Sequence, residues 1–194
     1  MLPDRTGRVT YSTMKKIRRP ELVFLDALNA FLSAEAHTLL TDVSERNTCG
    51  RLAIYLEQQI QTENLAGYYA DPEYNRKQNS KVKTIVNNQA RVVNITADLI
   101  VHSRGEKPPK EDNLIAVEVK KSTRPEGDKL EDKERLQAMT REPYDGVWPV
   151  DGTYPEHVCG YAVGVYVEID IDQRRLHLEF YKKGALTKQR EQNF

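Results

Sequence analysis

The chain has 194 residues, of which 39% are hydrophobic and 30% are charged. This length suits one compact domain, and the composition excludes an intrinsically disordered chain, which would combine low hydrophobicity with high net charge. Lysine plus arginine and aspartate plus glutamate each number 29, so the net charge is zero and composition by itself does not indicate a nucleic-acid-binding protein.

The cysteines and the apolar segments exclude two further classes. Cys49 and Cys159 are the only cysteines and do not form a CxxC pair, so neither a zinc site nor a disulfide framework is expected. No apolar run approaches the roughly 20 residues that span a bilayer, and the first residues lack the apolar core of a signal peptide. We therefore expect a cytoplasmic protein without a membrane partner.

The N-terminal part of the chain predicts an arm followed by a helix. Residues 1–19 are polar and basic without a sustained period, which is typical of a flexible arm. From Pro20 to Leu40 apolar residues recur at helical spacing, with proline in the first turn. We assign residues 20–42 to this extra N-terminal helix, which is a candidate interface of a homodimer.

A second helix is expected from about Ser44 to Thr62, at the start of a domain that occupies residues 43–194. Ser44 can cap its first turn. Its apolar stripe contains Cys49, Leu52, Leu56 and Ile60. At 100° per residue Glu45 projects onto the same stripe, one turn before Cys49. Glu45 is therefore expected to face inward at a helix end.

From residue 67 onward the pattern predicts strands. Five segments rich in valine, isoleucine and tyrosine are bounded by polar, proline or glycine breaks: Tyr68–Tyr74, Arg91–His102, Leu114–Lys120, Gly160–Ile169 and Arg175–Tyr181. Between the third and the fourth, Asp128–Arg141 carries three apolar residues among many charges and predicts an exposed helix. Residues 142–156 are expected to form a long surface loop.

The chemically informative stretch lies in the second and third predicted strands, which read as a hairpin. Glu118 and Lys120 share one strand face because side chains alternate. Ionised groups among apolar neighbours are costly unless they are paired or bind a metal. If Asp98 lies on the neighbouring strand, Asp98 and Glu118 can converge on one Mg²⁺, with Lys120 beside the attacking water. The alternative from spacing alone is a solvent-facing edge strand, with Asp98 ending a turn.

Asp98 with the Glu118-Val119-Lys120 triplet on a predicted hairpin resembles the PD-(D/E)XK nuclease superfamily, which has the restriction-endonuclease-like fold. SERNTCGRLAIYLEQQI resembles the first core helix, and PEYNRK the first core strand of uncharacterised bacterial members. DKLEDKERLQAMT and GYAVGVYVE resemble the closing helix and strand. The resemblance covers about residues 44–181. Ala97 departs from it, because the motif is named for a proline at that position.

This resemblance implies an α/β fold with a central four- or five-stranded mixed sheet flanked by helices. It also implies Mg²⁺- or Mn²⁺-dependent hydrolysis of phosphodiester bonds by a DNA endonuclease of restriction, defence or repair. The implied catalytic residues are Asp98, Glu118, Lys120 and Glu45. Asp98 and Glu118 would bind the metal, together with the Val119 carbonyl and with Glu45 as a direct or indirect acidic partner. Lys120 would position the attacking water as a base or stabilise charge.

Three further residues are candidates for substrate contact: Glu73, Arg76 and Lys121. The expected partner is nucleic acid, in the first place DNA. Two other classes stay open at this stage. One is a catalytically silent nuclease-fold module that binds nucleic acid or a protein. The other is an unrelated α/β small-molecule binder, whose commonest nucleotide-binding forms are excluded because the chain has no GxGxxG or GxxxxGK[ST] loop.

Overall fold

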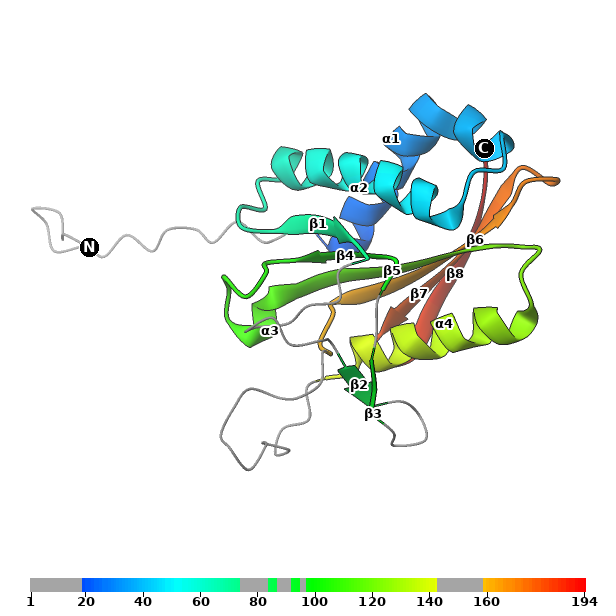
Figure 1. Ribbon diagram of the computed structural model, residues 1–194. Helices are drawn as coiled ribbons and strands as arrows, with labels where there is room; N and C mark the ends of the chain where they lie inside the picture. Colours follow the sequence, from blue (N-terminus) through cyan, green and yellow to red (C-terminus); the bar gives the residue numbers. More distant parts are fainter. Residues whose placement is uncertain (1–18, 74–83, 87–91, 95–96, 143–158) are drawn as a thin grey trace, which may run out of the picture.

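The computed structural model describes residues 19–73, 84–86, 92–94, 97–142 and 159–194 (Figure 1). The predicted arm, Arg76 and almost all of the predicted loop over 142–156 lie outside these residues. The first two elements are α1 (Pro20–Leu40) and α2 (Glu45–Thr62), as the sequence predicts. Pro20 occupies the first turn of α1, and the Ser44 side chain accepts a hydrogen bond from the Asn47 amide at the start of α2.

A six-stranded sheet forms the centre of the molecule, in the order β1-β4-β5-β6-β7-β8. Its strands are β1 (Tyr69–Pro72), β4 (Leu99–His102), β5 (Asn113–Lys121), β6 (Val163–Asp170), β7 (Arg175–Lys182) and β8 (Ala185–Asn193). The β5–β6 pair is parallel and the other pairs are antiparallel, so the sheet is mixed. The expected count of four or five strands is wrong.

The unpredicted sixth strand is β8. All its side chains are exposed except Gln192, which is intermediate, so β8 has no apolar alternation from which a strand could be predicted. Backbone pairing with β7 along its whole length defines it instead. The hairpin turn between them contains Lys183 and Gly184, both at positive φ. A strand fixed by its turn and by its neighbour's backbone leaves little trace in hydropathy.

The predicted strand Arg91–His102 is divided into two strands of different sheets. β3 (Val92–Asn94) pairs with β2 (Thr84–Val86) in a separate two-stranded sheet, whereas β4 belongs to the central sheet. The connection from β4 to β5 contains the short helix α3 (Pro109–Asp112). β4 and β5 are antiparallel neighbours, so the predicted hairpin is confirmed. Asp98 lies one residue before β4.

Helices cover both faces of the central sheet (Figure 1). α1 and α2 pack on one face against side chains that include Leu99, Val117 and Val165. α4 (Glu126–Thr140) packs on the opposite face, which we call the α4 face, against Ile100, Ala116, Tyr166 and Tyr181. The sequence predicts an exposed helix here, but Leu136 and Met139 of α4 are fully buried.

α1 also contacts the C-terminal hairpin. The ring of Phe24 packs edge to face on Phe180 of β7, with centroids 6.4 Å apart. Glu21 accepts hydrogen bonds from Lys182 and Lys188, at 2.8 and 3.0 Å. The first helix is therefore fixed against the last two strands of the sheet.

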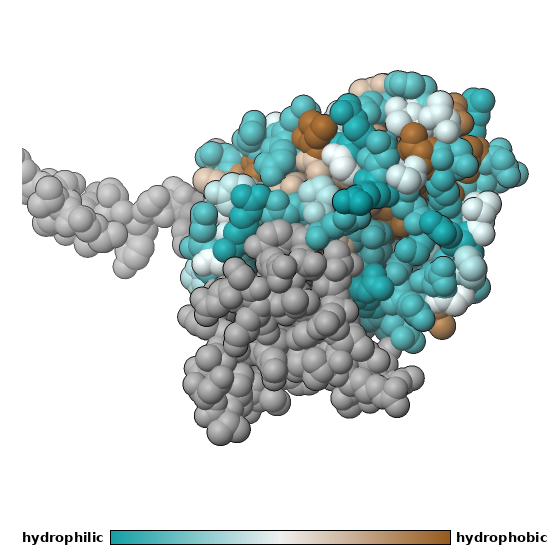
Figure 2. Space-filling model, viewed as in Figure 1, coloured by the Kyte–Doolittle hydropathy of each residue, from teal (hydrophilic) through white to brown (hydrophobic). Residues whose placement is uncertain are grey.

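The surface in Figure 2 is largely hydrophilic, with apolar side chains scattered over it. The large apolar residues that are exposed lie on four different elements or their ends: Leu40, Ile54, Leu130 and Leu186. None of the described helices has both the length and the apolar character needed to cross a bilayer.

Candidate metal centre

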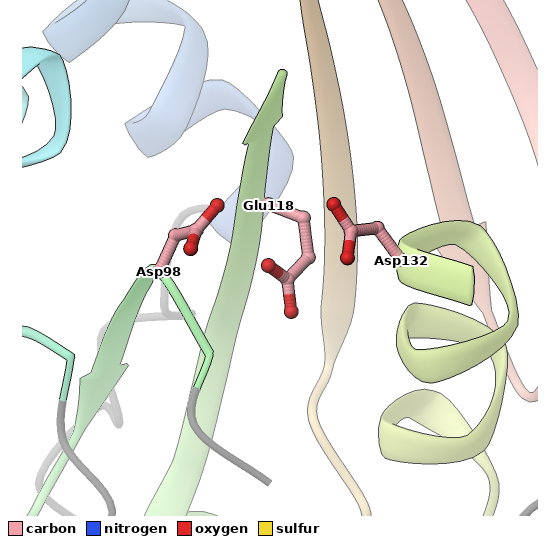
Figure 3. Close-up of side chains that lie close together, drawn as sticks. All are labelled: Asp98, Glu118 and Asp132. Carbon is pink, nitrogen blue, oxygen red and sulfur yellow. The ribbon is translucent and has the colours of Figure 1, made fainter. Parts of the chain in front are cut away.

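Three carboxylates meet on the α4 face of the sheet (Figure 3). Asp98 comes from the start of β4, Glu118 from β5 and Asp132 from α4. One carboxylate oxygen of each lies within 4.8 Å of the corresponding oxygens of the other two. Asp98 and Glu118 are thus brought together as the hairpin predicts, and a third acidic side chain joins them from the helix that covers the sheet.

The Asp98 carboxylate is fixed by the backbone of β5. Its Oδ2 accepts a hydrogen bond from the Val119 amide at 2.8 Å, and its backbone carbonyl accepts one from the Glu73 amide at 3.0 Å. The Asp98 carboxylate thus accepts a hydrogen bond from β5 that a backbone carbonyl would accept if β4 continued, and it does so directly before β4 begins. This leaves little freedom in the orientation of the carboxylate.

Glu118 lies inside the sheet layer with none of its surface exposed. Its Oε1 accepts a hydrogen bond from Arg135 Nη1 at 2.8 Å. Its Oε2 is buried and has no hydrogen-bond partner among the described residues. Native proteins pair most buried polar atoms, and a buried carboxylate oxygen without a partner is costly. Glu118 therefore carries an unmatched acceptor in a group of three carboxylates.

Asp132 is the site residue that the sequence reasoning missed. It is 3% exposed, and it forms ion pairs with Lys120 Nζ at 2.8 Å and with Arg135 Nη1 at 3.0 Å. A signal for it exists, because Asp132 precedes the buried Leu136 by four residues and so lies on the same helix face. Leu130, which is 56% exposed, does not lie on that face.

The charges of the site do not balance. With all three carboxylates ionised, they would face two cations, Lys120 and Arg135, and one negative charge would be in excess. Burial, and next the charge of Asp98, raise the pKa of Glu118 well above its ordinary value despite Arg135. Burial also raises the pKa of Asp98, although the Val119 amide opposes it. For Lys120, burial is the largest single effect and opposes the charged form, but the hydrogen bond to Asp132 and the charges of the surrounding carboxylates together outweigh it, so the pKa is raised.

The arrangement fits a hard divalent cation. Mg²⁺ binds oxygen at about 2.0–2.1 Å, so two ligands on opposite sides of the ion are about 4.2 Å apart, and Ca²⁺ allows somewhat more. The three ligand oxygens, all within 4.8 Å of one another, need only small side-chain adjustments to reach such a spacing. All three are carboxylate oxygens, the donor type that these ions prefer.

Glu45 lies outside the carboxylate cluster that the described residues form. Its Oε1 accepts hydrogen bonds from the Lys121 amide and from Arg124 Nε, both at 3.0 Å, and its Oε2 accepts one from Arg124 Nη2 at 3.2 Å. Burial is the largest single effect and opposes ionisation, but the hydrogen bonds from Arg124 and the Lys121 amide, together with the charges of Arg124 and Lys120, outweigh it and lower the pKa of Glu45. Both oxygens of Glu45 thus hold the end of β5, directly after Lys120.

The remaining predicted site residues that the structure describes are Lys121, Glu73 and Val119. Lys121 Nζ pairs with Asp42 at 2.6 Å, and Glu73 pairs with Arg46 at 3.0 Å. The Val119 amide points toward Asp98, and in a strand the amide and carbonyl of one residue point to the same side. The Val119 carbonyl therefore faces the start of β4, the side on which Asp98 lies.

No protein-family model, curated protein or solved structure matches this chain.

Proposed function

We propose that Asp98, Glu118 and Asp132 hold a Mg²⁺ or Mn²⁺ ion and that the protein is a metal-dependent phosphodiesterase that cuts nucleic acid, in the first place DNA. The observation that carries the proposal is the unpaired Oε2 of the fully buried Glu118, beside two further carboxylates. A bound cation would supply the partner that this oxygen lacks among the described residues and would offset the negative charge of the three carboxylates.

The order of elements supports a restriction-endonuclease-like core as part of the proposal. The resemblance requires a helix, a strand, a hairpin bearing the acidic residues, and then a closing helix and strand. α2, β1, β4–β5, α4 and β6 follow one another in this order, and β1, β4, β5 and β6 are neighbours in the sheet. In this view α1, β7 and β8 are additions to the core.

A bound divalent cation would act as a Lewis acid toward a phosphate oxygen and make a water molecule more acidic. Lys120 adds a fixed positive charge next to that position. Its Nζ is held at 2.8 Å by Asp132 and its pKa is raised, so it enters the reaction protonated. We assign Lys120 to stabilising the charge that develops on the phosphate and to orienting the water, and not to removing a proton.

Arg135 and Glu45 are positioning residues in this proposal. Arg135 Nη1 holds Glu118 Oε1, which leaves Oε2 as the oxygen of Glu118 without a partner among the described residues. Glu45 binds the Lys121 amide and so fixes the end of the strand that carries Lys120. In this proposal Glu45 is an indirect partner of the metal: it holds the backbone of β5 in place and does not bind the ion itself.

The first experiment is cleavage of supercoiled plasmid and of single-stranded DNA in Mg²⁺, Mn²⁺ or EDTA. Wild-type protein is expected to cut in either metal and not in EDTA. Lys120→Ala should reduce the rate about 100-fold or more, the usual effect of removing one group that stabilises developing charge. Glu179→Gln is the matched control, because Glu179 is a buried carboxylate of the α4 face whose partners are Lys133, Gln189, His177 and Tyr181.

Metal binding is measured separately, by the shift of the melting temperature with Mn²⁺. A ligand that binds only the folded state stabilises it, by about 2.7 kcal/mol at a hundred times its Kd. The shift is expected for wild type and Glu179→Gln and should disappear in Glu118→Ala. If Mn²⁺ binds but no substrate is cut, the catalytic proposal gives way to a nucleic-acid-binding module. If Mn²⁺ does not bind, the metal centre itself is refuted.

A further inference from the structure

Lys120 and Asp132 form an ion pair that competes with the roles proposed for both residues. Lys120 Nζ lies 2.8 Å from Asp132 Oδ2, and the Lys120 side chain is only 17% exposed. Water and salt screen an ion pair little at such a buried position. The proposed function, however, assigns Asp132 to the metal and Lys120 to the phosphate. Each of the two residues therefore has a second task for which the other must release it.

Arg135 leaves one oxygen of Asp132 open to this competition. Arg135 Nη1 lies 3.0 Å from Asp132 Oδ1 and donates to Glu118 Oε1 at 2.8 Å, so it holds the two carboxylates side by side. Oδ2 of Asp132 is the oxygen that faces Lys120. A cation bound among the three carboxylates thus competes with Lys120 for Asp132.

Glu168, the carboxylate opposite Lys120 in the β5–β6 register, is already engaged. Its Oε1 accepts a hydrogen bond from Lys129 at 3.1 Å, and its Oε2 accepts one from the Tyr166 hydroxyl at 3.3 Å. Glu168 therefore does not replace Asp132 as the partner of Lys120. A Lys120 amine displaced from Asp132 is available to an incoming phosphate.

The backbone of β5 keeps Lys120 at the site while its amine changes partner. On one side of Lys120, the Val119 amide donates to Asp98 Oδ2 at 2.8 Å. On the other side, the Lys121 amide donates to Glu45 Oε1 at 3.0 Å. A lysine carries its charge on a flexible four-carbon stem. The amine can therefore turn to a phosphate without a movement of the strand.

We infer that Lys120 occupies Asp132 in the ion-free protein and leaves it for a phosphate when a divalent cation binds at the metal centre. The inference rests on the proposed function and adds its regulation, which is an order of binding. Lys120 is available to a phosphate only after the cation has taken its place on Asp132. The ion-free protein therefore binds nucleic acid more weakly, and it does not retain a substrate that it cannot cut.

The first test is the affinity of Lys120→Met for Mn²⁺, measured by isothermal titration calorimetry without nucleic acid. Methionine keeps an unbranched side chain and removes the charge. The Kd for Mn²⁺ is expected to fall about tenfold, because the ion no longer competes with a charged hydrogen-bond donor. If the ion pair only fastened α4 to the sheet, its loss would loosen Asp132 and weaken Mn²⁺ binding instead.

Lys133→Met is the matched control. Lys133 is 21% exposed, and its Nζ lies 3.1 Å from Oε1 of Glu179, a buried carboxylate of the same α4 face. Glu179 lies outside the carboxylate cluster that the described residues form, and it keeps Tyr181 and Gln189 as donors. Lys133→Met removes the same charge and should leave the Kd for Mn²⁺ nearly unchanged. An equal gain in both variants would refute the exchange, because net charge alone would explain it.

The second test is nucleic-acid binding in EDTA, with a fluorescent single-stranded DNA oligonucleotide followed by anisotropy over a range of NaCl concentrations. Asp132→Asn should bind more tightly than the wild type and steepen the slope of log Kd against log salt by about one, because Lys120 gains a phosphate contact. Glu179→Gln removes the same charge from the same face and should leave the slope unchanged. Combined with Lys120→Met, Asp132→Asn should no longer steepen it.

The outcomes separate the two proposals. If the wild type binds Mn²⁺ and cuts DNA, but Lys120→Met binds Mn²⁺ no more tightly or Asp132→Asn shows no steeper slope, the exchange is refuted and the proposed function stands. If the wild type neither binds Mn²⁺ nor cuts DNA, the proposed function fails, and the exchange fails with it. Should Lys120→Met not fold, Lys120→Gln removes the same charge with a polar side chain and should show the same gain in Mn²⁺ affinity.

Discussion

Glu118 has no exposed surface, and its Oε2 has no hydrogen-bond partner among the described residues. Glu118→Gln removes one negative charge and balances the remaining two carboxylates against Lys120 and Arg135. In EDTA near neutral pH we expect this variant to be more stable than the wild type by about 1 kcal/mol, because an uncompensated buried charge is costly. For a chain of this size that corresponds to about 2–4 °C in melting temperature.

The sign of the pH dependence follows from the raised pKa of Glu118. A carboxyl group whose pKa is higher in the folded state stabilises the fold at low pH and loses this contribution as the pH rises through the raised value. The advantage of Glu118→Gln should therefore be absent below about pH 4 and grow toward neutrality. Calorimetry in EDTA at several pH values measures it. A melting temperature equal to or below that of the wild type at pH 7 would contradict it.

At the scale of single residues, part of the site could be predicted from the sequence. Asp98 and Glu118 could be predicted because the alternation of a strand and the register of a hairpin place them from local sequence. Asp132 could not be singled out in the same way, because α4 carries acidic residues on several faces: Glu126, Asp128, Glu131, Asp132 and Glu134. Only the packing angle of the helix decides which of them is buried, and one buried leucine is a weak guide to that angle.

Among the elements, α4 and β6 approach closely at Gly164. A β-carbon on Gly164 would lie 3.0 Å from Thr140 Cγ2 and 3.3 Å from Leu136 Cβ. Gly164→Ala is therefore expected to move α4 away from the sheet and to destabilise the fold by about 1–3 kcal/mol, as overpacking does. Because α4 carries Asp132, the shift of the melting temperature with Mn²⁺ should also become smaller.

Gly50→Ala provides the control for this substitution. Gly50 lies within α2, and a β-carbon there would have nothing within 4 Å. Alanine in a helix is favoured over glycine by roughly 0.5–1 kcal/mol, so this variant should melt higher than the wild type and keep the Mn²⁺ response. Urea unfolding of both variants is the measurement. A Gly164→Ala protein as stable as the wild type would show that α4 is not tightly packed on β6.

At the scale of elements the sequence predicts those whose apolar residues carry a period. The α2 stripe and the alternation in β4–β5 belong to this group. β8 does not, because its nine residues are polar and only the backbone of β7 defines it. Nor could the division of Arg91–His102 be predicted, since both halves are rich in valine and isoleucine and the chain changes sheets between them.

At the scale of the whole molecule, we expect low pH to weaken the contact between α1 and α2. Glu35 interrupts the helical dihedral angles of α1, with φ −133°, and its carboxylate binds Arg51 and Tyr55 of α2. The hydrogen bonds from Arg51 and then Tyr55 lower the pKa of Glu35 to about 2. A depressed carboxyl pKa stabilises the fold above about pH 4.5, and this contribution is lost as the pH falls toward 2.

Glu35→Gln should consequently lower the melting temperature at pH 6 and have a much smaller effect near pH 2, where about half of the wild-type carboxylates are protonated. Thermal unfolding followed by circular dichroism from pH 2 to pH 6 tests this. A difference between the two proteins that stays constant over the range would mean that the ion pair to Arg51 does not stabilise the fold.

The contact of α1 with the β7–β8 hairpin can form only late in the synthesis of the chain. Phe24 is made 156 residues before Phe180 (180 − 24 = 156), the ring on which it packs, and Glu21 precedes Lys182 by 161 residues. Segments so far apart in the chain meet late, because the entropy of closing a long loop is lost before the contact can stabilise the fold. On the ribosome α1 can pack on α2 as soon as α2 has emerged, whereas the part of α1 around Phe24 stays uncovered until β7 is made.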